Sequence, residues 1–181
     1  MPKGIILLNN GFEDVEAIAT IDVIRRAGIS IETFSLDDVN ITTQTGINMK
    51  SEKLYKDIKL DSYDFLVIPG GGAVFKYLHK RNEVSEIIKN FAEKKKLVAS
   101  ICAAPSLVGK LGYFKNKKFT CFPGCEEGIE GKYTGNGVEV VENFITAKSM
   151  AYAIDFSLEI VRYLLGKEVA KKVEKSIYAS K

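Results

Sequence analysis

The chain has 181 residues, of which 46% are hydrophobic and 27% are charged, and its formal net charge is +3. These proportions are typical of an ordinary globular protein and favour a single domain over residues 1–181. Because the lysines mostly alternate with acidic residues, we expect no concentrated basic face and no nucleic-acid partner. No apolar run is long enough for a signal peptide or a membrane span, so a soluble, cytoplasmic protein without a membrane partner is expected.

Apolar runs of strand length alternate with segments of helical period along the chain. Strands are predicted at 4–9, 30–35, 64–70, 97–101 and 119–121. Helices are predicted at about 14–27, 84–93, 149–165 and 167–176. This alternation is typical of an α/β fold with a mainly parallel sheet.

Two stretches depart from this alternation and predict antiparallel pairing. Residues 40–53 predict a hairpin that turns near Thr45 and Gly46. Residues 130–147 predict antiparallel strands with a turn at Asn136 and Gly137, because Asn-Gly is a preferred hairpin turn.

Three loops of the predicted sheet carry groups that could perform chemistry. The first contains Glu16, the second is the Pro-Gly-Gly-Gly run at 69–72, and the third contains Cys102. Ligands of open parallel sheets bind outside the carboxyl ends of the strands, so these loops are expected to meet at one edge.

Each of these groups also has a purely structural interpretation. Glu16 could interact with a helix dipole, the glycine run could form a tight turn, and Cys102 could fill the core. Their coincidence in three crossovers at one edge favours a functional role. A thiol at a helix N-terminus is expected to be nucleophilic and easily oxidised, and Glu16 suits such a site only if it is protonated or moves protons.

The segments EDVEAIATIDVIRRAG (13–28), DFLVIPGGG (64–72) and ASICAAPSLVGKLG (99–112) together resemble the ThiJ/PfpI superfamily. They are most similar to the branch that contains Parkinson disease protein 7 and its bacterial relatives. The resemblance implies a flavodoxin-like three-layer sandwich, a homodimer, and an oxidation-sensitive cysteine on a strained nucleophile elbow beside a protonated glutamate. It further implies that Cys102 is this cysteine, Glu16 is the glutamate, and the backbone amides of Gly71 and Ala103 are oxyanion donors.

The chain departs from the pattern of its relatives at several positions. Phe122 takes the place of the histidine that the branch usually carries, and Ala103 takes the place of the histidine that related hydrolases carry after the nucleophile. Ala104 replaces the usual glycine before proline, and Thr45 replaces an arginine of the hairpin. The one histidine, His79, falls at the end of the helix after the glycine run, where a surface or helix-end role is expected.

These departures rank the candidate functions. A Cys–His protease or amidotransferase needs an imidazole base and is disfavoured. The preferred function is an oxidative-stress-responsive protein in which Cys102 is oxidised to a sulfinate beside Glu16. One alternative is a cofactor-independent glyoxalase or deglycase acting on methylglyoxal or its adducts, and another is a non-catalytic binding or chaperone-like protein. The expected small-molecule partners are therefore oxidants or reactive aldehydes, with no cofactor.

The other two cysteines, Cys121 and Cys125, have a spacing that is loose for half of a zinc site, and no further cysteine or histidine completes one. No metal is therefore expected. The two thiols could simply pack in the core or lie in a loop. A sharper hypothesis is that one of them acts as a resolving thiol for oxidised Cys102, which requires the two cysteines to lie close together.

Overall fold

A seven-stranded sheet forms the centre of the computed structural model, which describes residues 1–178. The strand order is β10-β11-β7-β6-β1-β2-β5. The strands are β1 (Lys3–Leu7), β2 (Ser30–Ser35), β5 (Lys53–Leu54), β6 (Phe65–Ile68), β7 (Leu97–Ile101), β10 (Val138–Val141) and β11 (Phe144–Ala147). All neighbouring pairs are parallel except β10 and β11. This confirms the predicted mainly parallel sheet; the last three residues of the predicted domain lie outside the described residues.

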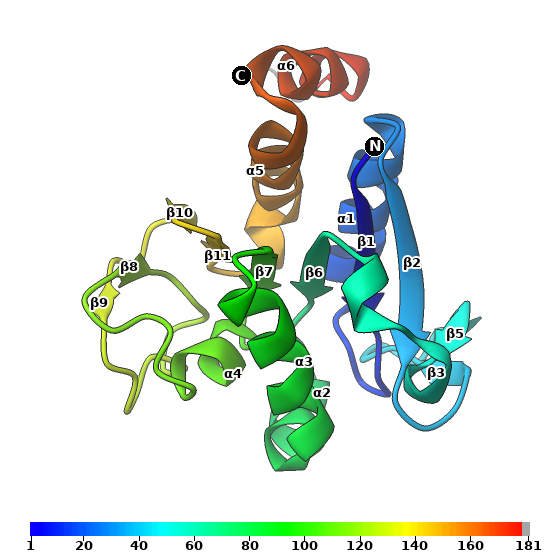
Figure 1. Ribbon diagram of the computed structural model, residues 1–181, viewed down its shortest axis with the longest axis vertical. Coiled ribbons are helices and arrows are strands. Elements are labelled where there is room, and N and C mark those ends of the chain that lie inside the picture. Colours follow the sequence, from blue (N-terminus) through cyan, green and yellow to red (C-terminus); the bar gives the residue numbers. More distant parts are fainter. Residues whose placement is uncertain (179–181) are drawn as a thin grey trace.

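Helices cover both faces of the sheet (Figure 1). They are α1 (Asp14–Arg26), α2 (Gly72–Lys76), α3 (Asn82–Glu93), α4 (Pro105–Gly109), α5 (Ala153–Leu165) and α6 (Lys167–Ser176). Short 3-10 turns are η1 (Tyr55–Asp57), η2 (Leu60–Ser62), η3 (Leu78–Lys80) and η4 (Met150–Tyr152). Buried side chains of α1, α5 and α6 pack in one core, and those of α2, α3 and α4 pack in the other. The arrangement is the expected three-layer sandwich.

Side chains of the central strands point alternately to the two faces of the sheet and so contribute to both cores. In β6, Phe65 and Val67 belong to the core of α1, α5 and α6, whereas Leu66 and Ile68 belong to the core of α2, α3 and α4. All four side chains are buried. Because a parallel strand covered on both faces has no solvent side, its sequence is a continuous apolar run.

Both ends of the first helix have capping residues, and the small hairpin forms where it is predicted. The Glu13 carboxylate accepts a hydrogen bond from the Glu16 amide (2.8 Å) and so caps α1, while Gly28 follows the helix with a φ of +77°. Strands β3 (Asn40–Thr42) and β4 (Asn48–Lys50) pair antiparallel, which confirms the hairpin predicted within 40–53.

Two predictions between residues 118 and 147 are wrong in detail. The strand expected at 119–121 is reduced to β8 (Lys118–Phe119), which pairs in parallel with β9 (Lys132–Tyr133) outside the central sheet. The antiparallel hairpin of β10 and β11 turns at Glu142 and Asn143, not at Asn136 and Gly137; Glu142 has a φ of +51°. Gly137 instead allows the Tyr152 ring to pack closely against the backbone, because a Cβ atom at this position would lie 2.3 Å from that ring.

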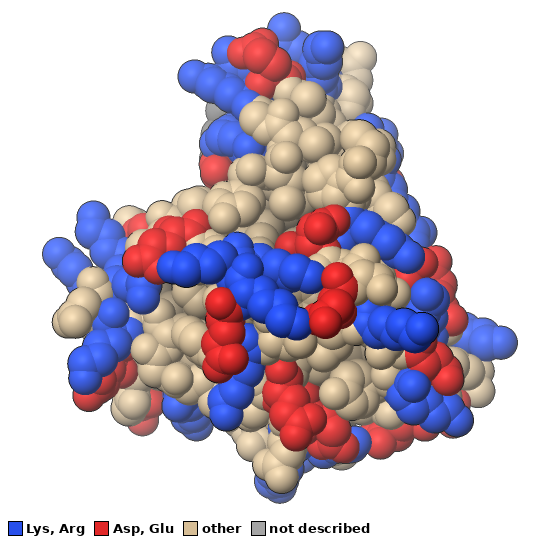
Figure 2. Space-filling view, viewed as in Figure 1, with Lys and Arg blue, Asp and Glu red and all other residues tan. Residues whose placement is uncertain are grey.

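The surface of the described chain carries mixed charges. On the face displayed in Figure 2, acidic side chains lie among the basic ones. Within residues 1–178, no helix is both long and apolar enough to span a bilayer.

Candidate functional site

The three chemistry-bearing loops meet because β7, β6 and β1 are neighbours and run in parallel. The Glu13 amide donates to the Gly70 carbonyl (3.1 Å), and the Ala73 amide donates to the Gly11 carbonyl (3.0 Å). These bonds join the loop after β1 to the loop after β6. The structure therefore brings together the sheet-edge loops expected from the sequence.

Cys102 lies on a left-handed turn between β7 and α4. Its φ is +64°, a region that side-chain-bearing residues adopt at a cost in conformational energy. Its amide donates to the Ala147 carbonyl at the end of β11 (2.9 Å), which holds the turn against the sheet. The side chain is half-buried. The backbone amides of Ala103 and Gly71 interact with the sulfur and favour its ionised form.

The glycine run allows the loops to approach the thiol closely. A Cβ atom on Gly70 would lie 2.7 Å from Cβ of Cys102 and 2.9 Å from Oε2 of Glu16. Gly71 has a φ of +91°, and a Cβ atom there would lie 2.6 Å from the Glu13 amide nitrogen. Both positions therefore require glycine, Gly70 for space and Gly71 for space and conformation.

Glu16 projects from the first turn of α1 into the site and is fully buried. Its Oε2 accepts a hydrogen bond from the Gly70 amide at 2.7 Å. Its Oε1 has no hydrogen-bond partner of normal geometry within residues 1–178, although the carboxyl interacts with the adjacent Cys102 thiol. Burial, against the opposing effect of the Gly70 and Cys102 hydrogen bonds, raises the pKa of Glu16 to about 7. This agrees with the raised pKa that a protonated role requires.

The thiol of Cys102 does not have the lowered pKa that its place before a helix suggests. Burial raises its pKa, and the charge of ionised Glu16 and the hydrogen bond between them raise it further. The Ala103 and Gly71 amides act in the opposite direction but are outweighed. Since α4 has only five residues, its N-terminus supplies little dipole. Thiol and carboxyl must therefore be treated as one coupled pair.

The positions that depart from the relatives' pattern lie on, or are hydrogen-bonded to, the segments that carry Cys102 and Glu16. The Phe122 amide donates to the Cys102 carbonyl (2.7 Å), so the residue in place of the histidine is adjacent to the elbow, with its side chain 48% exposed. Thr45 donates its hydroxyl hydrogen to Asp14 (2.7 Å) and so ties the hairpin to α1. Ala104, with helical φ and ψ values, is the N-cap of α4.

Two polar contacts near the site could not be predicted from the sequence. His79 Nε2 lies 2.9 Å from Ser106 Oγ, and this hydroxyl donates to the Ala103 carbonyl (2.7 Å). The helix-end position of His79 is as expected, but its contact with the helix behind Cys102 is not. The Gln44 side chain accepts a hydrogen bond from the Gly72 amide (2.7 Å). Each contact joins residues distant in sequence, so no local pattern predicts it.

Cys121 and Cys125 are buried and belong to the core of α2, α3 and α4, whereas Cys102 packs against the opposite core. Their predicted role as resolving thiols for Cys102 stays a prediction. In the described part of the chain, no cluster of three or more histidine, cysteine, aspartate or glutamate side chains is arranged to hold a metal ion.

A surface cavity of about 430 Å³ adjoins the glycine run. Its lining includes Gly11, Gly72 and Lys76, together with residues of the β3–β4 hairpin. It therefore shares the Gly70–Gly72 loop with the Cys102 site.

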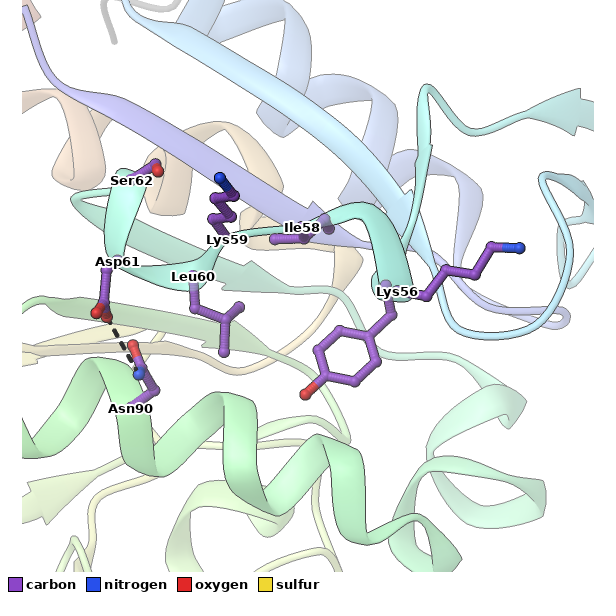
Figure 3. A pocket seen from close by; sticks show the side chains of 8 residues that line it. Lys56, Ile58, Lys59, Leu60, Asp61, Ser62 and Asn90 are labelled. Carbon is purple, nitrogen blue, oxygen red and sulfur yellow. Dashed lines mark hydrogen bonds between the residues drawn. The ribbon is translucent and has the colours of Figure 1, made fainter.

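A larger, open pocket of about 640 Å³ lies elsewhere, between η1, η2 and α3 (Figure 3). In it the Asn90 side chain donates to Asp61 (3.4 Å). Because η2 precedes β6, the η2 part of this pocket lies toward the amino end of β6, and the pocket lining contains neither Cys102 nor Glu16.

A parallel α/β sandwich with a cysteine on a left-handed strand-to-helix turn has the backbone geometry of the nucleophile-elbow class of proteins. The profile of the DJ-1/PfpI family matches residues 3–163. The chain belongs to this family, as the motifs around Glu16, Gly71 and Cys102 predict.

Curated relatives place the chain near the DJ-1 proteins. It is 31% identical to Drosophila melanogaster protein DJ-1alpha over 97% of this chain and 83% of that protein. It is 30% identical to the Danio rerio Parkinson disease protein 7 homolog over 95% of this chain and 94% of that protein. It is 28% identical to Arabidopsis thaliana protein DJ-1 homolog B over 97% of this chain, which spans only 41% of that relative.

Solved structures of DJ-1 proteins have the same fold. The Drosophila melanogaster DJ-1beta crystal structure superposes with a TM-score of 0.92 at 26% identity, covering 100% of both chains. The structure of oxidized Toxoplasma gondii DJ-1 superposes with a TM-score of 0.88 at 26% identity, covering 98% of both chains. These neighbours confirm the flavodoxin-like architecture.

Proposed function

We propose that this DJ-1 family protein responds to oxidants through Cys102, whose thiol is oxidised to a sulfinate beside Glu16. The observation that carries the proposal is the contact between a half-buried thiol and a fully buried carboxyl with an unpartnered oxygen. A solved relative, Toxoplasma gondii DJ-1, is described as oxidized, which supports oxidation chemistry in this family.

The residues around Cys102 suit a sulfinate better than a free thiolate. Two equivalents of hydrogen peroxide convert the thiol to the sulfinic acid and release two molecules of water. The new oxygens need hydrogen-bond donors. The amides of Gly71 and Ala103 can donate to one oxygen, and protonated Glu16 can donate to the other through Oε1. The raised pKa of Glu16, about 7, keeps that proton available near neutrality.

Mass spectrometry after mild peroxide treatment tests this proposal. We expect two added oxygen atoms on the tryptic peptide 97–110, which contains Cys102 as its one cysteine. The Cys102→Ala variant should lack this product, and the Cys121→Ser variant should retain it. Glu16→Gln should change the peroxide concentration that Cys102 requires. If peptide 97–110 gains no sulfinate, or gains it equally in the unfolded chain, the proposal fails.

Glyoxalase or deglycase chemistry is a second candidate, favoured by the cavity of about 430 Å³ that adjoins Gly72. In this reaction Cys102 would add to the aldehyde carbon of methylglyoxal, and the Gly71 and Ala103 amides would stabilise the resulting oxyanion. Glu16 would move a proton between the two carbons before lactate is released. Lactate production by wild type and its loss in Cys102→Ala, with buffer and amine-adduct controls, would support this candidate.

A non-catalytic binding or chaperone-like role is the third candidate. It gains support if Cys102 shows neither selective oxidation nor methylglyoxal turnover while the protein still suppresses aggregation of an unfolded client. For any of these functions we propose a cytoplasmic homodimer. Val15 and Ile18 on α1 are 45% and 48% exposed and offer apolar surface for a second copy. Light scattering of the purified protein measures its oligomeric state.

A further inference from the structure

Cys121 and Cys125 form a second pair of thiols, in the core opposite to the one that Cys102 contacts. Both are buried, with 0% and 9% of their surface exposed. They flank the exposed residues Phe122, Pro123 and Gly124. Two inward-facing thiols therefore lie beneath a three-residue surface turn.

The turn between the two cysteines brings them together. The Cys125 amide donates to the Phe122 carbonyl (2.9 Å), and Gly124 has a φ of +91°. This hydrogen bond reverses the chain direction within four residues. Both side chains then enter the same core, that of α2, α3 and α4.

Glu126 interacts with both thiols, by a hydrogen bond with Cys121 and electrostatically with Cys125. The Cys121 thiol donates to Glu126 Oε2 (3.9 Å), and the same oxygen accepts from the Gly124 amide (2.7 Å). The two cysteines also interact electrostatically with one another: burial, the neighbouring Cys125 and the charge of Glu126 raise the pKa of Cys121 to about 12. Burial and Glu126 raise the pKa of Cys125, against the opposing effect of Lys110.

We propose that Cys121 and Cys125 are a redox-active dithiol that forms a disulfide with one another, independently of Cys102. With hydrogen peroxide as the oxidant, the less buried Cys125 sulfur attacks one peroxide oxygen and becomes a sulfenic acid, while water leaves. The Cys121 sulfur then attacks the sulfenic sulfur of Cys125. Glu126 takes up the Cys121 proton and passes it to the departing hydroxide, which leaves as the second water. In total, two thiols and one peroxide give one disulfide and two waters.

This dithiol is adjacent to the elbow. The Phe122 amide, inside the turn that the disulfide would close, donates to the Cys102 carbonyl (2.7 Å). Closure would therefore restrain the segment that contacts Cys102.

Tryptic peptide mapping of the full chain tests the proposal, because the cysteines fall on two different peptides. Cys102 lies in 97–110, and Cys121 and Cys125 share 119–132. The Cys102→Ser variant is treated with hydrogen peroxide, its free thiols are alkylated under denaturing conditions, and it is digested. We expect 119–132 to be lighter by two hydrogen atoms, unalkylated, and restored by dithiothreitol.

The pH dependence gives a second readout. Below the raised pKa values, the rate of disulfide formation should rise about tenfold for each pH unit, in step with the thiolate fraction. The Glu126→Gln variant should form the disulfide at a different rate, and Cys125→Ser should not form it.

Two results would overturn the proposal. One is a cross-link between peptides 97–110 and 119–132 in the wild-type chain without any internal disulfide, which would make Cys102 the partner. The other is a peptide 119–132 that remains fully reduced in Cys102→Ser, or that carries only sulfinate and sulfonate.

Discussion

The carboxylate of Glu16 accepts a hydrogen bond from the Gly70 amide at 2.7 Å, and this contact joins the loop after β6 to the first turn of α1. The same carboxyl interacts with the Cys102 thiol. Glu16 therefore connects all three loops of the site, and its protonation state affects both the stability of the fold and the reactivity of the thiol.

Replacing Glu16 by glutamine should change how stability depends on pH. The folded pKa of about 7 lies above the ordinary value of 4.5, so the native state binds more protons between these values and its stability falls as pH rises. The loss is roughly 3 kcal/mol for a shift of this size. Glutamine stays neutral and should not lose this stability.

Thermal unfolding at about pH 5 and about pH 8 measures the effect. The wild type should lose more of its unfolding temperature than Glu16→Gln between these pH values, by about 2–4 °C for each kcal/mol in a chain of this size. Parallel decreases in the two proteins would show that Glu16 is ionised throughout this range.

Adding one methyl group at Gly70 should disrupt the site. The Cβ atom of Gly70→Ala would lie 2.7 Å from Cβ of Cys102, and overpacking of this kind costs about 1–3 kcal/mol. We expect lower stability and altered alkylation of Cys102. Gly72→Ala is the matched control, since its Cβ would lie 3.7 Å or more from its neighbours. Equal behaviour of the two variants would contradict the packing described.

His79 should give a stability dependence of opposite sign to that of Glu16. Burial and nearby Lys110 lower the pKa of His79 below 6.5, so the unfolded state binds more protons and stability is lost as pH falls from about 6.5 through the folded value. His79→Gln should remove this loss on the acid side. Denaturant titrations at pH values on both sides of about 6 measure the free energy of unfolding. If this free energy depends on pH equally in wild type and His79→Gln, the pKa of His79 is not lowered by folding.

Restoring a histidine at position 122 should favour aldehyde chemistry. Phe122 is 48% exposed, and its amide is bonded to the Cys102 carbonyl, so Phe122→His should fold normally and place an imidazole beside the elbow. If the glyoxalase function is present, general acid–base catalysis should raise lactate production, by about 100-fold at the lower end of such effects. Phe122→Leu is the control; lactate production equal to that of Phe122→Leu would exclude a role for an imidazole here.

The sequence predicted the elements whose signals are local. The apolar run that includes Phe65 and Val67 identifies a strand buried on both faces, and the positions of Glu16 and Cys102 after parallel strands place them at one edge. The Asn136-Gly137 pair predicts a hairpin turn that the chain does not form. Glycine is needed at position 137 because the Tyr152 ring packs closely against it, and this contact exists only in the folded chain. The raised pKa of Cys102 can be predicted only in part. The effect of a nearby ionised carboxylate follows from its charge, but burial, which is the largest cause, depends on packing across loops.

The rate at which iodoacetamide alkylates Cys102, followed from about pH 6 to about pH 9 on peptide 97–110, tests the coupled thiol–carboxyl pair most directly. In the wild type, the pair loses its first proton near pH 7 and then shares the remaining proton. A constant fraction of molecules therefore carries a thiolate beside protonated Glu16, so the rate should rise and level off near pH 7. In Glu16→Gln, the levelling near pH 7 should be absent, and the rate should follow the thiol's own pKa. Superimposable profiles for the two proteins would contradict the account.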